Sequence, residues 1–182
     1  MNFAALEQNL CDNISEAQQK LSGSPMPISL NYMLPSLRHL LETDASAPEM
    51  RDILAEFSAY AALRLGTLEL RQIDGGFCIR VPKEGAEWVH DNIEPSAFLA
   101  ALLAALRAPD VTTEQVFAVF RQFAADAVIE ESRDEEFDYL AFFPDGVPDA
   151  YRYCIRAEEE PDGSMHISYH RFTFADYADF GI

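Results

Sequence analysis

Residues 95–107 form the stretch that most restricts how this chain folds. Their sequence, PSAFLAALLAALR, has only leucine, phenylalanine and alanine between Ser96 and Arg107. A helix of this composition is apolar on almost every side, so it must be buried in a core or in an interface. Two placements remain open: the helix is core between the two halves of the chain, or one side is exposed and drives homodimerisation.

Two later stretches are typical of β-hairpins. In TLELRQIDGGFCIRVP, residues 67–82, apolar and polar side chains alternate on both sides of an Asp-Gly-Gly turn. In YRYCIRAEEEPDGSMHISYHRF, residues 151–172, the alternation is interrupted by a Pro-Asp-Gly turn. Proline suits the second position of such a turn, and glycine suits a left-handed backbone.

The other elements predicted from the sequence are mainly helices. Apolar residues at three- and four-residue steps predict amphipathic helices, over about residues 3–20, from Pro35, over 48–65 and over 113–125. Thr112 and Gln115 fit a capping box for the last of these. ISLNYML at residues 28–34 is a short strand candidate, and Thr173 can cap a short helix in FADYADF at the C-terminus.

These elements predict an α+β fold. The first half follows the order helix, strand, helix, helix, hairpin, and the second half has two helices, a three-stranded antiparallel sheet and a short C-terminal helix. The acidic run EESRDEEFD, residues 130–138, is interpreted as a solvated linker. We expect two subdomains, 1–92 and 93–182, packed as one compact unit.

Charge restricts the partners. The 182 residues include 31 acidic and 13 basic side chains, a formal net charge of −18, with −6 on residues 1–92 and −12 on residues 93–182. Proteins that bind nucleic acids or anionic membranes neutralise phosphates with Lys and Arg. We therefore expect neither nucleic acid nor membrane as a partner, which leaves a protein partner or a homo-oligomer.

Cysteine usage and the N-terminal residues indicate the cytoplasm. Cys11, Cys78 and Cys154 are far apart and form no C-x-x-C pair, which predicts neither a disulfide framework nor a zinc site. The first twenty residues lack the basic and apolar regions of a secretory signal, and no run is long enough to cross a bilayer. No metal and no cofactor are expected.

The first half resembles a winged-helix domain. The resemblance covers roughly residues 3–90 and depends on the element order and on LGTLELRQIDGGFCIRVPKEGAEWVHD, residues 65–91, with its glycine helix end and Asp-Gly-Gly wing. In DNA-binding members the helix before the wing is basic. Here that helix offers Arg51 and Arg64 against Glu49, Asp52 and Glu56, so the resemblance implies a protein-docking module rather than a DNA reader.

Over its full length, the chain is similar to a family of small acidic bacterial proteins that has no assigned activity. The stretches EFDYLAFFPDG, residues 136–146, and YHRFTFADYADFGI, residues 169–182, belong to this resemblance. It implies a bacterial, cytosolic origin, and it supplies no functional residues.

The second hairpin carries the candidate site. Strand alternation places Arg152, Cys154 and Arg156 on one face, together with His166 and His170 of the facing strand. The two arginines and two histidines could bind a carboxylate or phosphate, or they are exposed and pair with nearby acidic residues. Two histidines four residues apart on a strand are separated by about 13 Å, too far for one metal ion. No catalytic residue is assigned.

No catalytic signature accompanies these residues. The chain has neither a G-x-S-x-G elbow nor a glycine-rich phosphate loop after a strand. Together with the ample apolar helix surface, this favours a non-enzymatic cytosolic protein that binds another protein or itself. The first alternative is a small-molecule or anion-binding enzyme with its pocket over the second hairpin, and the second is a DNA-binding regulator or an acidic DNA mimic.

Overall fold

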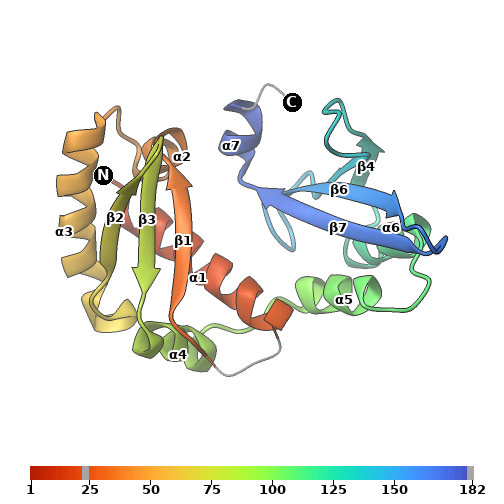
Figure 1. Ribbon diagram of the computed structural model, residues 1–182, viewed down its shortest axis with the longest axis horizontal. Helices are drawn as coiled ribbons and strands as arrows, with labels where there is room; N and C mark the ends of the chain where they lie inside the picture. Colours follow the sequence, from red (N-terminus) through yellow and green to blue (C-terminus); the bar gives the residue numbers. More distant parts are fainter. Residues whose placement is uncertain (22–24, 180–182) are drawn as a thin grey trace. The chain divides into compact units, whose positions relative to one another are not determined.

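The structure, a computed structural model, describes residues 1–21 and 25–179 (Figure 1). The chain divides into two compact units, Met1–Pro95 and Ser96–Ile182, whereas the sequence predicts a division between residues 92 and 93. Each unit has its own apolar core. The packing of the two as one compact unit stays a prediction. None of the described helices combines the length and the apolar character that a bilayer crossing requires.

The first unit contains four helices and a three-stranded antiparallel sheet among its described residues. The elements are α1 (Phe3–Leu21), β1 (Ile28–Met33), α2 (Leu34–Leu41), α3 (Ala47–Leu65), β2 (Glu69–Ile73), β3 (Gly76–Val81) and α4 (Lys83–Asn92). The sheet order is β1-β3-β2. The predicted order of helix, strand, helix, helix, hairpin is therefore present, while membership of the winged-helix fold stays a prediction.

The turn between β2 and β3 depends on two glycines. Ile73 pairs with Gly76, so Asp74 and Gly75 form a two-residue turn, in which Gly75 has a φ of +70°. Gly76 also pairs with Met33 of β1. A Cβ atom at Gly76 would lie 2.0 Å from the carbonyl oxygen of Tyr32, so the neighbouring strand requires glycine there.

The core of the first unit is formed by the apolar stripes of its helices and by strand β3. Leu6, Leu10 and Ile14 of α1 are fully buried, as the three- and four-residue steps predict. They lie in one cluster with Leu37, Leu41, Met50, Leu54, Phe57, Ala61, Leu65, Phe77, Ile79 and Val81. Ser46 and Glu49 form a capping box at the start of α3, which helps to fix where this helix begins.

One carboxylate is buried where α1 meets α3. Glu7 Oε2 lies 2.8 Å from the guanidinium of Arg64, whose side chain remains 43% exposed. Glu7 Oε1 is buried and has no hydrogen-bond partner among the described residues. Burial raises the pKa of Glu7, and the nearby Arg64 only partly offsets this.

The raised pKa of Glu7 predicts a pH dependence of stability. The folded protein binds the Glu7 proton more tightly than the unfolded chain does, so the contribution of Glu7 to the free energy of unfolding falls as pH rises from about 4.5 towards the folded-state pKa. The wild type should therefore lose stability relative to Glu7→Gln as pH rises above about 4.5, as measured by urea denaturation.

Glu49→Gln provides the matched comparison. Hydrogen bonds from Ser46 lower the pKa of Glu49, so its stabilising contribution is present at neutral pH and is lost on acidification. The free energy of unfolding of the wild type, relative to that of Glu49→Gln, should therefore rise with pH, whereas relative to Glu7→Gln it should fall. If the two differences changed with pH in the same direction, the environments assigned to Glu7 and Glu49 would be contradicted.

The second unit contains three helices and a four-stranded antiparallel sheet among its described residues. The elements are α5 (Ala97–Leu106), α6 (Thr113–Phe123), β4 (Val128–Glu131), β5 (Tyr139–Phe142), β6 (Arg152–Glu159), β7 (Met165–Phe172) and α7 (Phe174–Asp179), and the strand order is β4-β5-β6-β7. The predicted class, α+β, is confirmed. The capping box of α6 and the Thr173 cap of α7 are confirmed as well.

The predicted number of strands in this sheet, three, is wrong. The additional strand β4 pairs only with β5, and it includes Glu130 and Glu131 from the stretch interpreted as a linker. An edge strand tolerates exposed carboxylates because one of its sides faces no other strand. Two predicted features extend beyond the described residues. They are the SGSPMP break, at residues 22–24, and the terminal helix, at Phe180.

Helices α5 and α6 cover one face of this sheet, and α7 lies at the other face (Figure 1). Phe98, Leu99, Leu102 and Leu103 of α5 are buried in the core of the second unit and Leu106 is partly buried, whereas Ala97, Ala100 and Ala104 are exposed. The core is largely aromatic: the Phe98 ring lies 4.9 Å from that of Phe143 and 5.4 Å from that of Tyr153. Homodimerisation through α5 stays a prediction.

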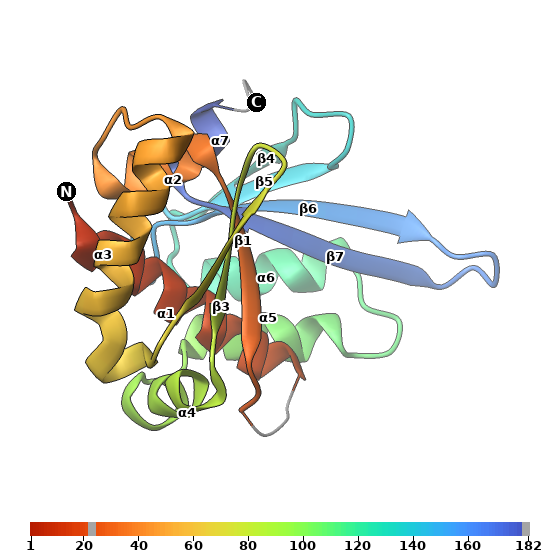
Figure 2. The ribbon, with the colours of Figure 1, turned by 60° about the vertical axis from the view of Figure 1, so that its left-hand side comes forward.

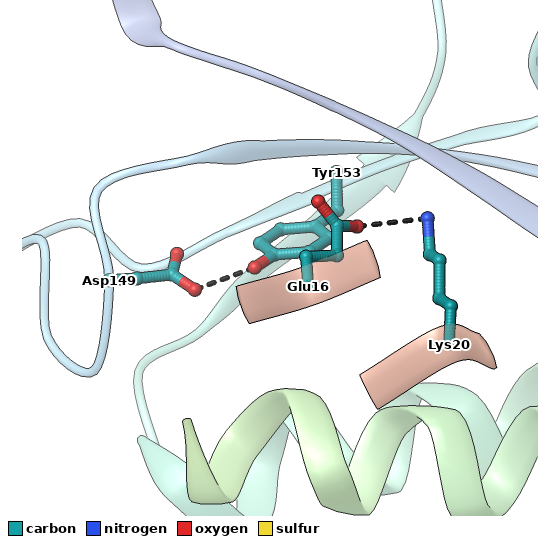
Figure 3. Close-up of polar contacts among 4 residues, drawn as sticks. All are labelled: Glu16, Lys20, Asp149 and Tyr153. Carbon is teal, nitrogen blue, oxygen red and sulfur yellow. Dashed lines mark hydrogen bonds and ion pairs between the residues drawn. The ribbon is translucent and has the colours of Figure 1, made fainter. Parts of the chain in front are cut away.

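Tyr153 combines an aromatic and a polar role in this core. Its side chain is fully buried, and its hydroxyl donates a 2.6 Å hydrogen bond to Asp149 Oδ2 (Figure 3). Asp149 Oδ1 accepts a hydrogen bond from the backbone N–H of Tyr151, so the carboxylate also fixes the start of β6.

Figure 3 also draws an ion pair within α1 of the first unit, in which Lys20 Nζ lies 2.9 Å from Glu16 Oε1.

Substitutions of Tyr153 should separate these two roles. Tyr153→Phe removes only the hydroxyl and should cost about 1.5–3 kcal/mol of unfolding free energy, the value of a hydrogen bond to a charged group. Tyr153→Ala also empties the ring site and should cost about 3–5 kcal/mol. Denaturant titrations measure both values, and equal losses for the two variants would show that ring packing contributes little.

Candidate functional site

The predicted site residues lie on the face of the four-stranded sheet opposite the aromatic core. The register of β6 and β7 pairs Arg152 with Phe172, Cys154 with His170, Arg156 with Ser168 and Glu158 with His166. Residues that are directly paired share a face of the sheet. We call this face, with Leu140 and Phe142 of β5 and with Glu130 of β4, the outer face.

Arg152 packs against two aromatic rings on the outer face. Its guanidinium carbon is 3.9 Å from the centroid of the Phe142 ring and 5.0 Å from that of the Phe174 ring. The side chain is partly buried, and burial lowers the pKa of Arg152. Phe174 belongs to α7, the short helix that follows β7 (Figure 2), so this helix contributes directly to the surroundings of the arginine.

Cys154 lies at the centre of the outer face and is fully buried. Burial, together with the carboxylate of Asp134, raises the pKa of its thiol to about 11. A thiol with such a pKa stays protonated at neutral pH, so the two neighbouring arginines do not activate it as a nucleophile. The pKa of Tyr177 in α7 is also raised by burial, and Cys154 and Glu130 add to this effect.

Arg156 and His166 lie nearer the hairpin turn and are exposed. The guanidinium of Arg156 is 2.7 Å from Glu158 Oε1, two residues along the same strand and on the same face. Glu158 is also the residue that β7 pairs with His166. This end of the outer face is therefore a solvated region in which positive and negative groups alternate.

His170 occupies an intermediate position. It is exposed, and its ring lies 5.6 Å from that of Phe137 and 6.5 Å from that of Phe172. The four predicted ligands thus do not form a single group, because Arg156 pairs with Glu158 while Arg152 packs against the rings of Phe142 and Phe174. Whether they bind an anion stays a prediction.

No metal centre is formed by the part of the chain that the structure describes. No three of its His, Cys, Asp and Glu side chains converge in an arrangement that could hold a metal ion. The three cysteines are free thiols, and all are buried.

A second candidate surface lies on the outer side of α3. Leu63 is 97% exposed, and Tyr60 is 43% exposed. The alanines at positions 55, 59 and 62 are exposed beside them. We call these five residues the α3 face. A leucine that is almost wholly in water gains nothing from burial in its own unit, so its side chain is available for contact with a partner.

The first unit also has an apolar pocket of about 330 Å³ between α1, the start of β1 and α4. Ile14 and Ala86 form part of its wall, and the exposed side chains of Leu21 and Met26 lie at its edge. Gln18 donates a 2.7 Å hydrogen bond to the Ala86 carbonyl, which joins α1 to α4 beside the pocket.

Comparison with models of known protein families assigns the chain to one of them. Residues 3–181 match the model of a family described as "Domain of unknown function, E. rectale Gene description (DUF3877)". The chain belongs to this family. The predicted membership of an unassigned bacterial family is thereby confirmed. No curated protein and no solved structure matches the chain.

The aromatic residues around Arg152 were not anticipated from the sequence. Strand alternation places Arg152 on the outer face, but it does not show that Phe142 and Phe174 cover the guanidinium. One signal was available: Leu140 and Phe142 on the outer face of β5 alternate with the inward-facing Ala141. Apolar residues on a face that is otherwise polar indicate that something covers it.

The high thiol pKa values predict slow alkylation of the folded protein. Burial raises the pKa of Cys11 and of Cys154 to about 11, so at pH 8 only about one thiol in a thousand is ionised. Iodoacetamide labelling of each peptide, quantified by mass spectrometry, should be at least tenfold slower at both cysteines in native protein than in urea. Rapid native labelling of Cys154 would show that its thiol is activated.

Proposed function

We propose that this protein is a non-enzymatic, protein-binding module of the bacterial cytoplasm that docks a partner through the α3 face. The observation that supports this most strongly is the exposure of Leu63, 97%, on a helix whose opposite side is buried. Fully exposed leucines that lie among small residues allow a partner to approach closely. The three free cysteines fit a reducing compartment.

The charge of the chain favours a basic partner. The net charge of −18 attracts basic proteins over long distances and repels a second copy of the chain. The residues flanking the α3 face include Asp52 and Glu56, both exposed. We therefore propose a partner that presents an apolar side chain within a basic surface.

The same helix is poorly suited to nucleic acid. Arg51 lies 3.7 Å from Asp52, and Arg64 lies 2.8 Å from Glu7, so both arginines of α3 already have acidic partners. On the adjoining hairpin, Arg80 lies 3.5 Å from Glu69. Neutralised arginines supply little of the counterion release that drives binding to phosphates. This supports protein docking over DNA reading for the first unit.

Leu63→Asp should abolish partner binding. The substitution places a charge at the centre of the α3 face, and because the side chain is exposed, folding should be unaffected. Tagged wild-type protein should retain basic proteins from a bacterial lysate at low salt and release them at high salt, as identified by mass spectrometry, while Leu63→Asp retains none of them.

Ala104→Asp is the matched control, because it adds the same charge to an exposed helical position in the other unit. It should retain the same proteins as the wild type. Identical capture by wild type and Leu63→Asp would contradict docking at the α3 face. A concentration-dependent dimer in light scattering that Leu63→Asp dissociates would instead identify a second copy as the occupant.

A further inference from the structure

The Arg152 guanidinium packs against two aromatic rings, and none of its nitrogen atoms is among the buried polar atoms that lack a partner in the described residues. Phe142 lies at 3.9 Å and Phe174 at 5.0 Å from the guanidinium carbon, measured to the ring centroids. The five N–H donors of an arginine lie in the guanidinium plane and point outward from its edge. Aromatic rings at the faces therefore restrict the orientation of the plane without occupying any donor.

Arg152 has no acidic partner among the described residues, whereas several other arginines of the chain do. Five others lie within 4.0 Å of a carboxylate oxygen: Arg51, Arg64, Arg80, Arg121 and Arg156. Arg152 makes neither an ion pair nor a side-chain hydrogen bond with any residue in the described ranges, although the chain has 31 acidic residues. The nitrogen atoms of Arg152 are not among the buried atoms without a partner, so its N–H groups reach solvent and remain available to an oxyanion.

The charged surroundings restrict how many negative charges such a ligand can carry. The groups that interact electrostatically with neighbouring Tyr177 are Cys154, Glu130, Arg133 and Arg152, so a second arginine is near while a carboxylate is also present. Residues 93–182 carry a net charge of −12. This field opposes polyanions such as nucleic acids far more than a ligand with one or two charges.

We propose that the edge of Arg152 binds the carboxylate or phosphate group of a small molecule by two parallel N–H···O hydrogen bonds. The rings of Phe142 and Phe174 hold the guanidinium plane in the orientation that this bidentate contact needs. The site lies in the second unit, so it is independent of the docking function proposed for the α3 face.

The test reads the Arg152 side chain directly in the full-length protein. In ¹H–¹⁵N NMR spectra, the Nε–Hε signal of Arg152 should shift and saturate on titration with sodium phosphate or sodium benzoate, with sodium chloride at equal ionic strength as the reference. Saturation by only one of the two salts identifies the oxyanion that the site takes. Shifts that stay linear with both salts, or that equal those with chloride, would overturn the proposal.

Three variants test the geometry. Arg152→Gln should lose saturable shifts of the neighbouring backbone amides, and Arg152→Lys, which keeps the charge but not the planar fork, should bind at least fivefold more weakly. Arg156→Gln, which changes an arginine paired with Glu158, should bind as the wild type does. Equal weakening by Arg152→Gln and Arg156→Gln would indicate a diffuse charge effect and overturn the proposal. The wild-type titration remains decisive if a variant does not fold.

Discussion

Each unit of this protein depends on the burial of apolar side chains between its helices and its sheet. In the first unit the stripes of α1, α2 and α3 pack around β3, and in the second unit α5 and α6 pack their phenylalanines and leucines against one sheet face. Burial on this scale is the dominant favourable term in folding. It also determines which surfaces remain for binding, namely the α3 face and the outer face of the four-stranded sheet.

Charge then decides what these surfaces can bind. With 31 acidic and 13 basic side chains in the chain, five arginines lie within 4.0 Å of a carboxylate, as Arg64 does even where the partner, Glu7, is buried. An excess of acidic charge on this scale repels polyanions. The two proposals rest on two side chains. Leu63 is an apolar group without a packing partner in its unit, and Arg152 is a cation without an acidic partner among the described residues.

Local sequence signals predicted most of the fold. Capping residues such as Thr112, the turn glycines Gly75 and Gly163, and the helical stripes specified where elements begin, end and face. Strand β4 was missed because four residues ending in two glutamates resemble a loop until a neighbouring strand is known. The site was harder to predict because strand alternation specifies a face but not what covers it. The rings at Arg152 come from β5 and α7, which are distant in sequence from each other.

The α3 face is the surface through which we propose that the protein binds a basic partner. Incorporating a photo-crosslinking phenylalanine analogue at position 63, with position 104 as the control, tests this inside bacterial cells. We predict a covalent adduct with a basic protein from position 63 and none from position 104. No adduct at either position, or the same adducts at both, would contradict the claim.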